Sequence, residues 1–425
     1  MTTPELNDFL TLTGPGTPMG ALFRRYWIPA LMSSELPEAD CPPVRVKLLS
    51  ERLIAFRDSQ GRVGLMDEFC AHRGVSLWFA RNEDNGLRCP YHGWKYDVTG
   101  QCIDVPSEPI ESGFCSKIKL KSYECVELGD VIWAYMGPPE LKPPLPNFEW
   151  CNVSHASRFV SKRTQECNWL QAMEGGIDSA HVSFLHRYEL KSDSLHVSKG
   201  AELTAKTDVA FEVVETDGGM VIGVRRPAHE GHYYWRITQW VMPFHSMIPP
   251  YGDNALNGHA WVPIDDENCW SWCFTHHPTR ALTDHELHVM SNGGGIHVSL
   301  VPGSFRPVIN KDNDYLMDRA AQKANQTYCG VKTIAMQDAA IQESMGPIQD
   351  RSKENLTSTD NGVIMARIRL RKAALAAQQG QEPDGLAPAT HAVRSASIVL
   401  PEGASFQEAA AEALQVREGA DPTSV

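Results

Sequence analysis

Long apolar runs are missing from this chain of 425 residues. No stretch approaches the roughly 18 apolar residues of a membrane-spanning helix, and the first residues lack the basic start and apolar core of a signal peptide. Basic side chains are scarce, with 39 lysines and arginines against 52 acidic residues, and the net charge is −13. This balance argues against nucleic-acid binding. We expect a cytoplasmic protein that binds neither membrane nor nucleic acid.

The sequence also lacks a disulfide framework and a nucleotide-binding motif. Its eleven cysteines are odd in number and show no spacing typical of secreted proteins, so we expect reduced thiols. The glycine-rich stretches 14–16 and 293–295 lack the strand, G-x-G-x-x-G and helix order of a dinucleotide site. Electrons from a nicotinamide or flavin would therefore have to come from a separate protein.

Two short cysteine and histidine pairs are the strongest chemical signal. Cys70-Ala-His72 is followed after sixteen residues by Cys89-Pro-Tyr-His92. Two thiolates on one iron and two imidazoles on the other are the ligands of a Rieske [2Fe–2S] cluster. The same four side chains could hold a structural zinc ion, but zinc fingers usually pair Cys with Cys and His with His. The mixed pairs favour the cluster.

The residues around these pairs resemble the two cluster-binding loops of the Rieske family. Arg73-Gly74 follows the first pair, and the second lies within Arg88-Cys-Pro-Tyr-His-Gly-Trp94. Respiratory Rieske proteins carry one more cysteine in each loop, whereas Val75 and Tyr91 stand at those positions here. The departure implies the lower-potential branch that includes the ring-hydroxylating oxygenases.

A second metal motif runs from Asn168 to His186 and resembles the mononuclear-iron motif of Rieske non-haem iron oxygenases. Such enzymes bind Fe(II) through two histidines and one carboxylate and leave positions open for O₂. The resemblance makes His181 and His186 the two histidine ligands. On a regular helix they would point about 140° apart, so we expect a break or widened turn near Ser183. The alternative is a pair of ordinary helix histidines.

The resemblance gives Asp178 a role other than iron ligation. The matching residue in the family hydrogen-bonds an iron-ligating histidine and a cluster-ligating histidine of the next subunit. Here Asp178 would link His181 to His92 of a neighbouring chain and offer an electron path. The alternative is a solvated helix carboxylate. Glu174 is either a carboxylate behind the metal site or a buried helix residue.

The third iron ligand has to be a carboxylate further along the chain. The segment from Ile334 to Ser352 looks like the third-ligand region of the phthalate-dioxygenase-like branch, and Asp338 takes the ligand position. Asp338 heads an apolar-spaced helical stretch, which suits a side chain that faces inward. Glu343 and Asp350 are the fallback candidates.

The pattern of elements predicts an α+β chain with two main domains. Short strands separated by turn signals, such as Val131–Tyr135, indicate an all-β domain, and mixed strands and helices follow. We expect four segments: an entry segment at 1–40, a Rieske domain at 41–148, a mononuclear iron domain of helices packed on an antiparallel sheet at 149–380, and a tail at 381–425 with an Ala-rich helix from Phe406 to Val416.

The chain as a whole resembles the oxygenase subunit of Rieske oxygenases, closest to phthalate dioxygenase and its aromatic O-demethylase relatives. The resemblance implies a terminal oxygenase that takes electrons from a separate NAD(P)H-dependent reductase, directly or through a ferredoxin, and uses O₂ to hydroxylate or O-demethylate an aromatic substrate. It also implies a trimer or stacked hexamer in which electrons pass between subunits. The competing hypothesis is a Rieske-type electron carrier without oxygenase activity.

The substrate is predicted less sharply than the reaction. Arg225, Arg226 and Arg236 lie in the β-rich region that would line a pocket, and a guanidinium is the usual partner of a carboxylate. A phthalate or a lignin-derived methoxybenzoate would fit. Arg225 and Arg226 are adjacent on a strand, so at most one of them can face the pocket. Ordinary surface arginines are the alternative for all three.

Overall fold

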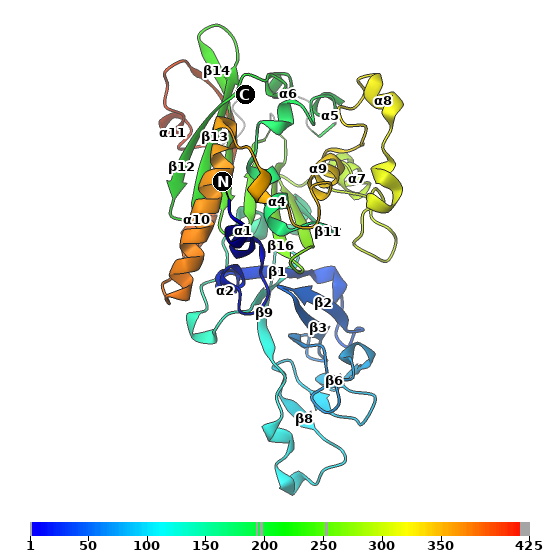
Figure 1. Ribbon diagram of the computed structural model, residues 1–425. Coiled ribbons are helices and arrows are strands. Elements are labelled where there is room, and N and C mark those ends of the chain that lie inside the picture. The colour runs from blue at the N-terminus through cyan, green and yellow to red at the C-terminus, as the bar shows by residue number, and fades with distance from the viewer. Residues whose placement is uncertain (1, 193, 196–198, 251–253, 417–425) are drawn as a thin grey trace. The chain divides into compact units, whose positions relative to one another are not determined.

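The computed structural model describes residues 2–192, 194–195, 199–250 and 254–416 (Figure 1). The chain forms two compact units, one of residues 13–143 and one that combines residues 2–12 with residues from 144 onward. Within the described ranges, no helix has both the length and the apolar character to cross a bilayer.

The unit of residues 13–143 is built on antiparallel strands. Six of them form a sheet in the order β1-β10-β9-β4-β3-β2, and four short ones form a second sheet, β5-β6-β7-β8. Every residue of β10 is buried, as expected for an apolar central strand. The strands are β1 Trp27–Met32, β2 Val44–Leu48, β3 Glu51–Arg57, β4 Val63–Asp67, β5 Arg81–Glu83, β6 Gly86–Arg88, β7 Lys95–Tyr96, β8 Cys102–Asp104, β9 Ser122–Leu128 and β10 Val131–Tyr135; helix α2 is Pro18–Phe23.

The larger unit has an eight-stranded antiparallel sheet in the order β11-β17-β16-β15-β14-β13-β12, with β18 paired to β14. Its strands are β11 Arg158–Gln165, β12 Ala210–Thr216, β13 Gly219–Pro227, β14 His232–Val241, β15 His245–Ile248, β16 Leu256–Pro263, β17 Cys269–His276 and β18 Ala396–Pro401. Its helices are α1 Pro4–Thr11, α3 Glu149–Asn152, α4 Trp169–Ile177, α5 Glu189–Ser192, α6 Lys199–Thr204, α7 Asp284–Ser291, α8 Arg319–Lys323, α9 Ile334–Glu343, α10 Asn361–Gln378 and α11 Phe406–Ala409.

Helix α4 is the element that joins this sheet to the metal motif. It packs against β16 and α9, and Gly176 is required there because a Cβ would lie 2.0 Å from the Trp261 ring. Asn168 caps the helix by accepting the Leu170 N–H. Helix α10 runs beside β12 and β13 (Figure 1). The sheet and its helices give the α+β architecture that the sequence predicts.

Two local predictions differ from the structure. The C-terminal helix is confined to Phe406–Ala409 and is followed by turns. The residues before it form β18, which completes the sheet. The helix that begins at Trp169 ends at Ile177, before either histidine, rather than near Ser183.

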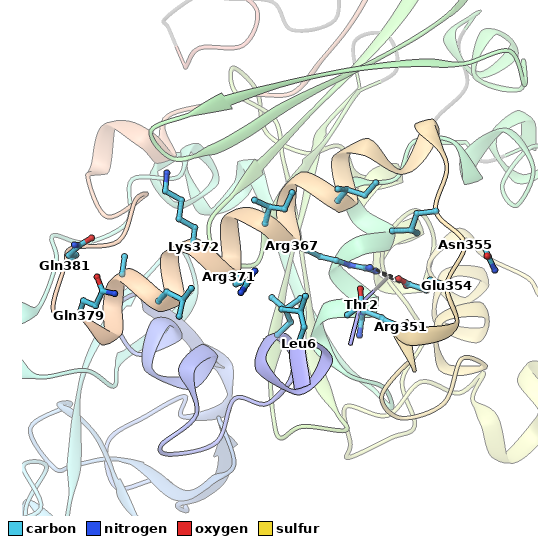
Figure 2. A pocket seen from close by; sticks show the side chains of 16 residues that line it. Thr2, Leu6, Arg351, Glu354, Asn355, Arg367, Arg371, Lys372, Gln379 and Gln381 are labelled. Carbon is cyan, nitrogen blue, oxygen red and sulfur yellow. Dashed lines mark hydrogen bonds and ion pairs between the residues drawn. The ribbon is translucent and has the colours of Figure 1, made fainter. Parts of the chain in front are cut away.

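A buried ion-pair cluster fixes α4 to α10. Glu174 Oε1 accepts from Arg367 Nε at 2.6 Å, and Glu174 Oε2 accepts from Arg351 Nη2 at 3.2 Å. Arg367 also binds Glu354, as Figure 2 shows along the groove between α1 and α10. Burial opposes ionisation of Glu174, but the two guanidinium charges outweigh it and hold its pKa below the usual value. Glu174 is therefore a buried structural carboxylate.

Replacing Arg367 by alanine should lower the free energy of unfolding by about 3–5 kcal/mol, because it leaves the Glu174 charge with one partner in a buried site. Urea denaturation of the whole protein measures this change in the free energy of unfolding. Lys353→Ala removes an exposed ion pair with Asp350 and is the matched control, expected to have no measurable effect. Equal losses in the two variants would contradict the assignment.

Candidate functional site

The two cysteine and histidine loops of the smaller unit have the same backbone design. Each cysteine N–H donates to the carbonyl five residues on, Cys70 to Val75 at 2.9 Å and Cys89 to Trp94 at 2.8 Å. The glycine four residues after each cysteine has positive φ, 72° at Gly74 and 78° at Gly93, a conformation that glycine adopts without strain. The loops therefore present their side chains as a matched pair.

The four side chains of these loops divide into an inner and an outer pair. Cys70 and Cys89 are buried, whereas His72 and His92 are exposed, with ring centroids 4.5 Å apart. Tyr96 places its hydroxyl 3.2 Å from the Cys70 sulfur. The structure records no three of the four donor atoms within 4.8 Å of one another. A single zinc ion would need that closeness, whereas a two-iron cluster spans a wider gap, so these residues fit a [2Fe–2S] group.

The larger unit holds a compact set of metal donors. His181, His186 and Asp338 each offer one ligand atom within 4.8 Å of the other two, the single such group in the described part of the chain. Asp338 Oδ1 lies 3.1 Å from His186 Nε2 and 3.4 Å from His181 Nε2. Two neutral imidazoles and one carboxylate are the donor set of non-haem Fe(II) oxygenases.

The backbone brings the two histidines together by leaving the helix early. Asp178 is the C-cap of α4 in an extended conformation, and His181–Ser183 form a 3₁₀ turn. The ring centroids of His181 and His186 are 5.1 Å apart. The break that the geometry requires thus begins at Asp178, five residues before the predicted position at Ser183.

A second residue orients each histidine. Asp178 Oδ2 lies 3.3 Å from His181 Nδ1, and the Gln337 side-chain oxygen lies 2.7 Å from His186 Nδ1. The amide of Gln337 donates in turn to the Val331 carbonyl at 2.9 Å, which fixes its orientation. Both histidines therefore hold their Nδ1 in a hydrogen bond and turn Nε2 toward Asp338, the tautomer that a metal ligand needs.

The two carboxylates shape the charge of the site. Burial opposes protonation of His181, but hydrogen bonds with Asp178 and Asp338 raise its pKa to about 10. Burial also opposes ionisation of Asp338, yet the two histidines hold its pKa far below the usual range. A bound cation would replace the proton on His181 as the partner of these carboxylates.

The fallback ligands lie elsewhere. Glu343 accepts hydrogen bonds from the Glu166 N–H and the Tyr315 hydroxyl. Asp350 caps a 3₁₀ turn and pairs with Lys353. Neither belongs to the group around Asp338.

The three predicted arginines have three different environments. Arg236 lines a cavity of about 100 Å³ together with the three metal donors. Arg226 is fully buried and donates to the Ser179 carbonyl and the Ser183 hydroxyl, on either side of His181. Arg225 lies on the other face of the strand, 4.3 Å over the Tyr233 ring. Arg236 is thus the one of the three in the cavity.

Three residues of the site have no motif in the sequence. Gln337 is signalled only by its place beside Asp338. Arg163 and His259 line the same cavity from β11 and β16, where each reads as an ordinary strand residue. His259 Nδ1 donates to the Trp272 carbonyl at 3.2 Å, and burial together with the charge of Arg163 lowers its pKa to about 4. It is a neutral side chain of the cavity wall.

Comparisons with known proteins identify both domains of the chain. Residues 26–124 match the Rieske [2Fe-2S] domain family, and residues 134–419 match the family described as LigXa C-terminal domain like. The chain is 38% identical to the 3-chlorobenzoate-3,4-dioxygenase oxygenase subunit of Comamonas testosteroni over 95% of this chain and 96% of that protein. It is also 38% identical to the phthalate 4,5-dioxygenase oxygenase subunit of Pseudomonas putida, over 91% of this chain and 89% of that protein.

Among solved structures, dicamba monooxygenase bound to 3,6-dichlorosalicylic acid shares the fold. Its TM-score is 0.58 at 18% identity, and the match covers 83% of this chain and 97% of that one. The two relatives are both oxygenase subunits, and their match extends over nearly the whole chain. The chain therefore belongs to the Rieske non-haem iron oxygenases, as the oxygenase subunit that carries both the [2Fe–2S] domain and the catalytic domain.

Proposed function

We propose that this oxygenase hydroxylates or O-demethylates an aromatic carboxylate, a phthalate or a methoxybenzoate, at iron held by His181, His186 and Asp338. The observation that carries the proposal is that these three donors and Arg236 line the same cavity. Iron bound there would supply reductive activation of O₂. Cys70, Cys89, His72 and His92 would hold the cluster that provides the electrons.

Arg236 is the residue that we assign to the substrate carboxylate. It is 3% exposed and lies on the same face of β14 as Thr238, which also lines the cavity. A buried guanidinium can form two parallel hydrogen bonds to a carboxylate, which fixes both the position and the plane of an aromatic acid. The ring would then sit at a defined distance from the iron.

Substituting Arg236 by glutamine should raise KM for aromatic carboxylates about 10- to 100-fold, the loss expected for one charge-assisted hydrogen-bonded pair. Steady-state assays with the reductase measure it. Arg225→Gln is the matched control, because this neighbouring arginine lies on the opposite face and stacks on Tyr233. If uncharged amide analogues lost as much as the acids, Arg236 would not be the carboxylate partner.

Product analysis decides between the two reactions. Oxygen inserted into a methyl ether gives an unstable hemiacetal, which breaks down to a phenol and formaldehyde. Oxygen added to the ring leaves a hydroxylated product and releases no formaldehyde. Turnover of a panel of phthalates and methoxybenzoates, followed by mass spectrometry and a formaldehyde assay, assigns the reaction. A panel without any oxygenated product would contradict the proposed function.

Electron delivery from a neighbouring subunit is part of the same proposal. Asp178, His181 and Asp338 also line an outer groove of about 200 Å³. The partly exposed apolar side chains Ile341, Met345 and Leu356 border that groove. On the other unit, His72 and His92 are exposed beside Tyr91, which is 54% exposed. These surfaces support docking of one subunit's cluster against the next subunit's Asp178, in a homotrimer or stacked hexamer.

The remaining partners follow from the electron balance. Electrons would reach the cluster from a separate NAD(P)H-dependent reductase, directly or through a ferredoxin. A cytoplasmic location would give the enzyme access to that reductant. Mixing the oxygenase with candidate reductases and NADH or NADPH, and recording bleaching of the cluster, identifies the partner.

A further inference from the structure

Arg163 is a second guanidinium in the substrate cavity, and the sheet register fixes its direction. On β11, Arg163 is paired with Ser271 of β17, which is paired in turn with Trp261 of β16. Directly paired residues of an antiparallel sheet share a face, and Trp261 lines the cavity. The adjacent Lys162 points the other way, with its ammonium 4.5 Å from the Trp270 ring.

Among the described residues, none is an acidic partner for the charge of Arg163. The side chain is 3% exposed, and its guanidinium forms no ion pair with a carboxylate of the described residues. Nη1 donates to the Gln165 side chain at 2.8 Å, and Nη2 reaches the Ala335 carbonyl only at 3.5 Å. Nε is buried without a hydrogen bond. A buried cation is costly unless an anion or strong acceptor completes its coordination.

The fork of Arg163 is nevertheless held in place. The amide of Gln165 donates to Gln342 at 2.6 Å, and Gln342 is itself a residue of the cavity wall. A fixed, incompletely bonded guanidinium that faces a cavity is the arrangement expected of an anion-binding group.

We infer that Arg163 is a second anion-binding residue of the cavity and selects substrates with two acidic groups on the aromatic ring. The inference rests on the proposed function, because it adds a second contact to the one assigned to Arg236.

The position of the two arginines indicates which acids would fit. Arg163 lies on β11 and Arg236 on β14, four strand spacings apart in the order β11-β17-β16-β15-β14, or about 19 Å measured across the strands, and the register sets them at different levels along the strands. The two guanidiniums therefore enter the cavity from different sides. Acidic groups on non-adjacent ring carbons, as in benzene-1,3- and benzene-1,4-dicarboxylate, match this placement better than groups on neighbouring carbons.

Binding to the holoenzyme without O₂ tests the inference. Calorimetry with benzoate and with the 1,2-, 1,3- and 1,4-dicarboxylates gives the Kd of each acid. We expect the 1,3- or 1,4-isomer to bind about 10- to 100-fold more tightly than benzoate. Arg163→Gln should remove this preference and leave the Kd of benzoate nearly unchanged, and Arg163→Lys should restore part of it. Arg236→Gln should weaken binding of every acid.

A matched variant separates recognition from structure. Lys162→Gln removes a cation that is equally buried on the opposite face of β11, so it should keep the preference for dicarboxylates even where it lowers Tm. The inference would be overturned if Arg163→Gln weakened binding of benzoate and of the dicarboxylates by the same factor. It would also be overturned if the wild-type protein bound all four acids with the same Kd. Either result would leave Arg236 as the carboxylate partner. Failure of every acid to bind wild type would overturn the proposed function as well.

Discussion

Replacing Asp338 by alanine is expected to remove the mononuclear iron and to lower product formation by at least about 100-fold. Losing a residue that only hydrogen-bonds a metal ligand already lowers activity by up to about 100-fold, and losing a ligand should cost at least as much. Asp338 lies 3.1 Å and 3.4 Å from the Nε2 atoms of His186 and His181, so it is the anionic member of the donor set. Metal analysis should show loss of one iron per chain, with the two cluster irons and the visible spectrum unchanged.

Asp350→Ala provides the control for this experiment. It removes a carboxylate from the same stretch of chain, but one that caps a turn and pairs with Lys353. Iron content and product formation should match wild type. Loss of iron in Asp350→Ala with retention in Asp338→Ala would reassign the third ligand.

Replacing Asp178 by asparagine is expected to preserve both metal centres and to slow product formation roughly 10- to 100-fold. Asparagine has the same size but no charge to pair with His181 Nδ1, 3.3 Å from the native carboxylate. The site would still bind iron through its three donors. Rapid mixing of reduced, substrate-loaded protein with O₂ should show slow oxidation of the cluster at unchanged iron content.

Asp360→Asn is the matched variant for Asp178. Asp360 lines the same outer groove, but its carboxylate binds the backbone and hydroxyl of Thr357 rather than a histidine. In the Asp360→Asn variant, the cluster should be oxidised at the wild-type rate. If Asp178→Asn behaved in the same way, electron transfer would not depend on this carboxylate.

Much of the fold could be predicted from local patterns. The strand expected at Val131–Tyr135 forms β10, because short apolar runs between turn residues identify strands well. The C-terminal segment differs more from its local pattern. β18 gains its partner in β14, more than 150 residues earlier, and the Ala-rich run ends its helix after four residues. Long-range pairing of this kind leaves little local signal.

The candidate site likewise has parts that local sequence predicts and parts that depend on long-range packing. His181 and His186 stand close together in the sequence, and the structure places them beside Asp338 as the resemblance implies. The early end of α4 could not be predicted, because close packing of Gly176 on Trp261 is tertiary information. Arg163 and His259 belong to strands that meet only in the folded sheet, so the sequence could not reveal them as neighbours of the iron site.

A single-turnover experiment tests the central claim most directly. Reduced protein loaded anaerobically with Fe(II) is mixed with O₂ and a panel of aromatic carboxylates, while the cluster spectrum and the products are followed together. The account predicts that the right acid accelerates oxidation of the cluster and yields oxygenated product in proportion, and that His186→Ala abolishes both effects. Oxidation at one rate with every acid, without product in wild type, would contradict it and leave a Rieske-type electron carrier.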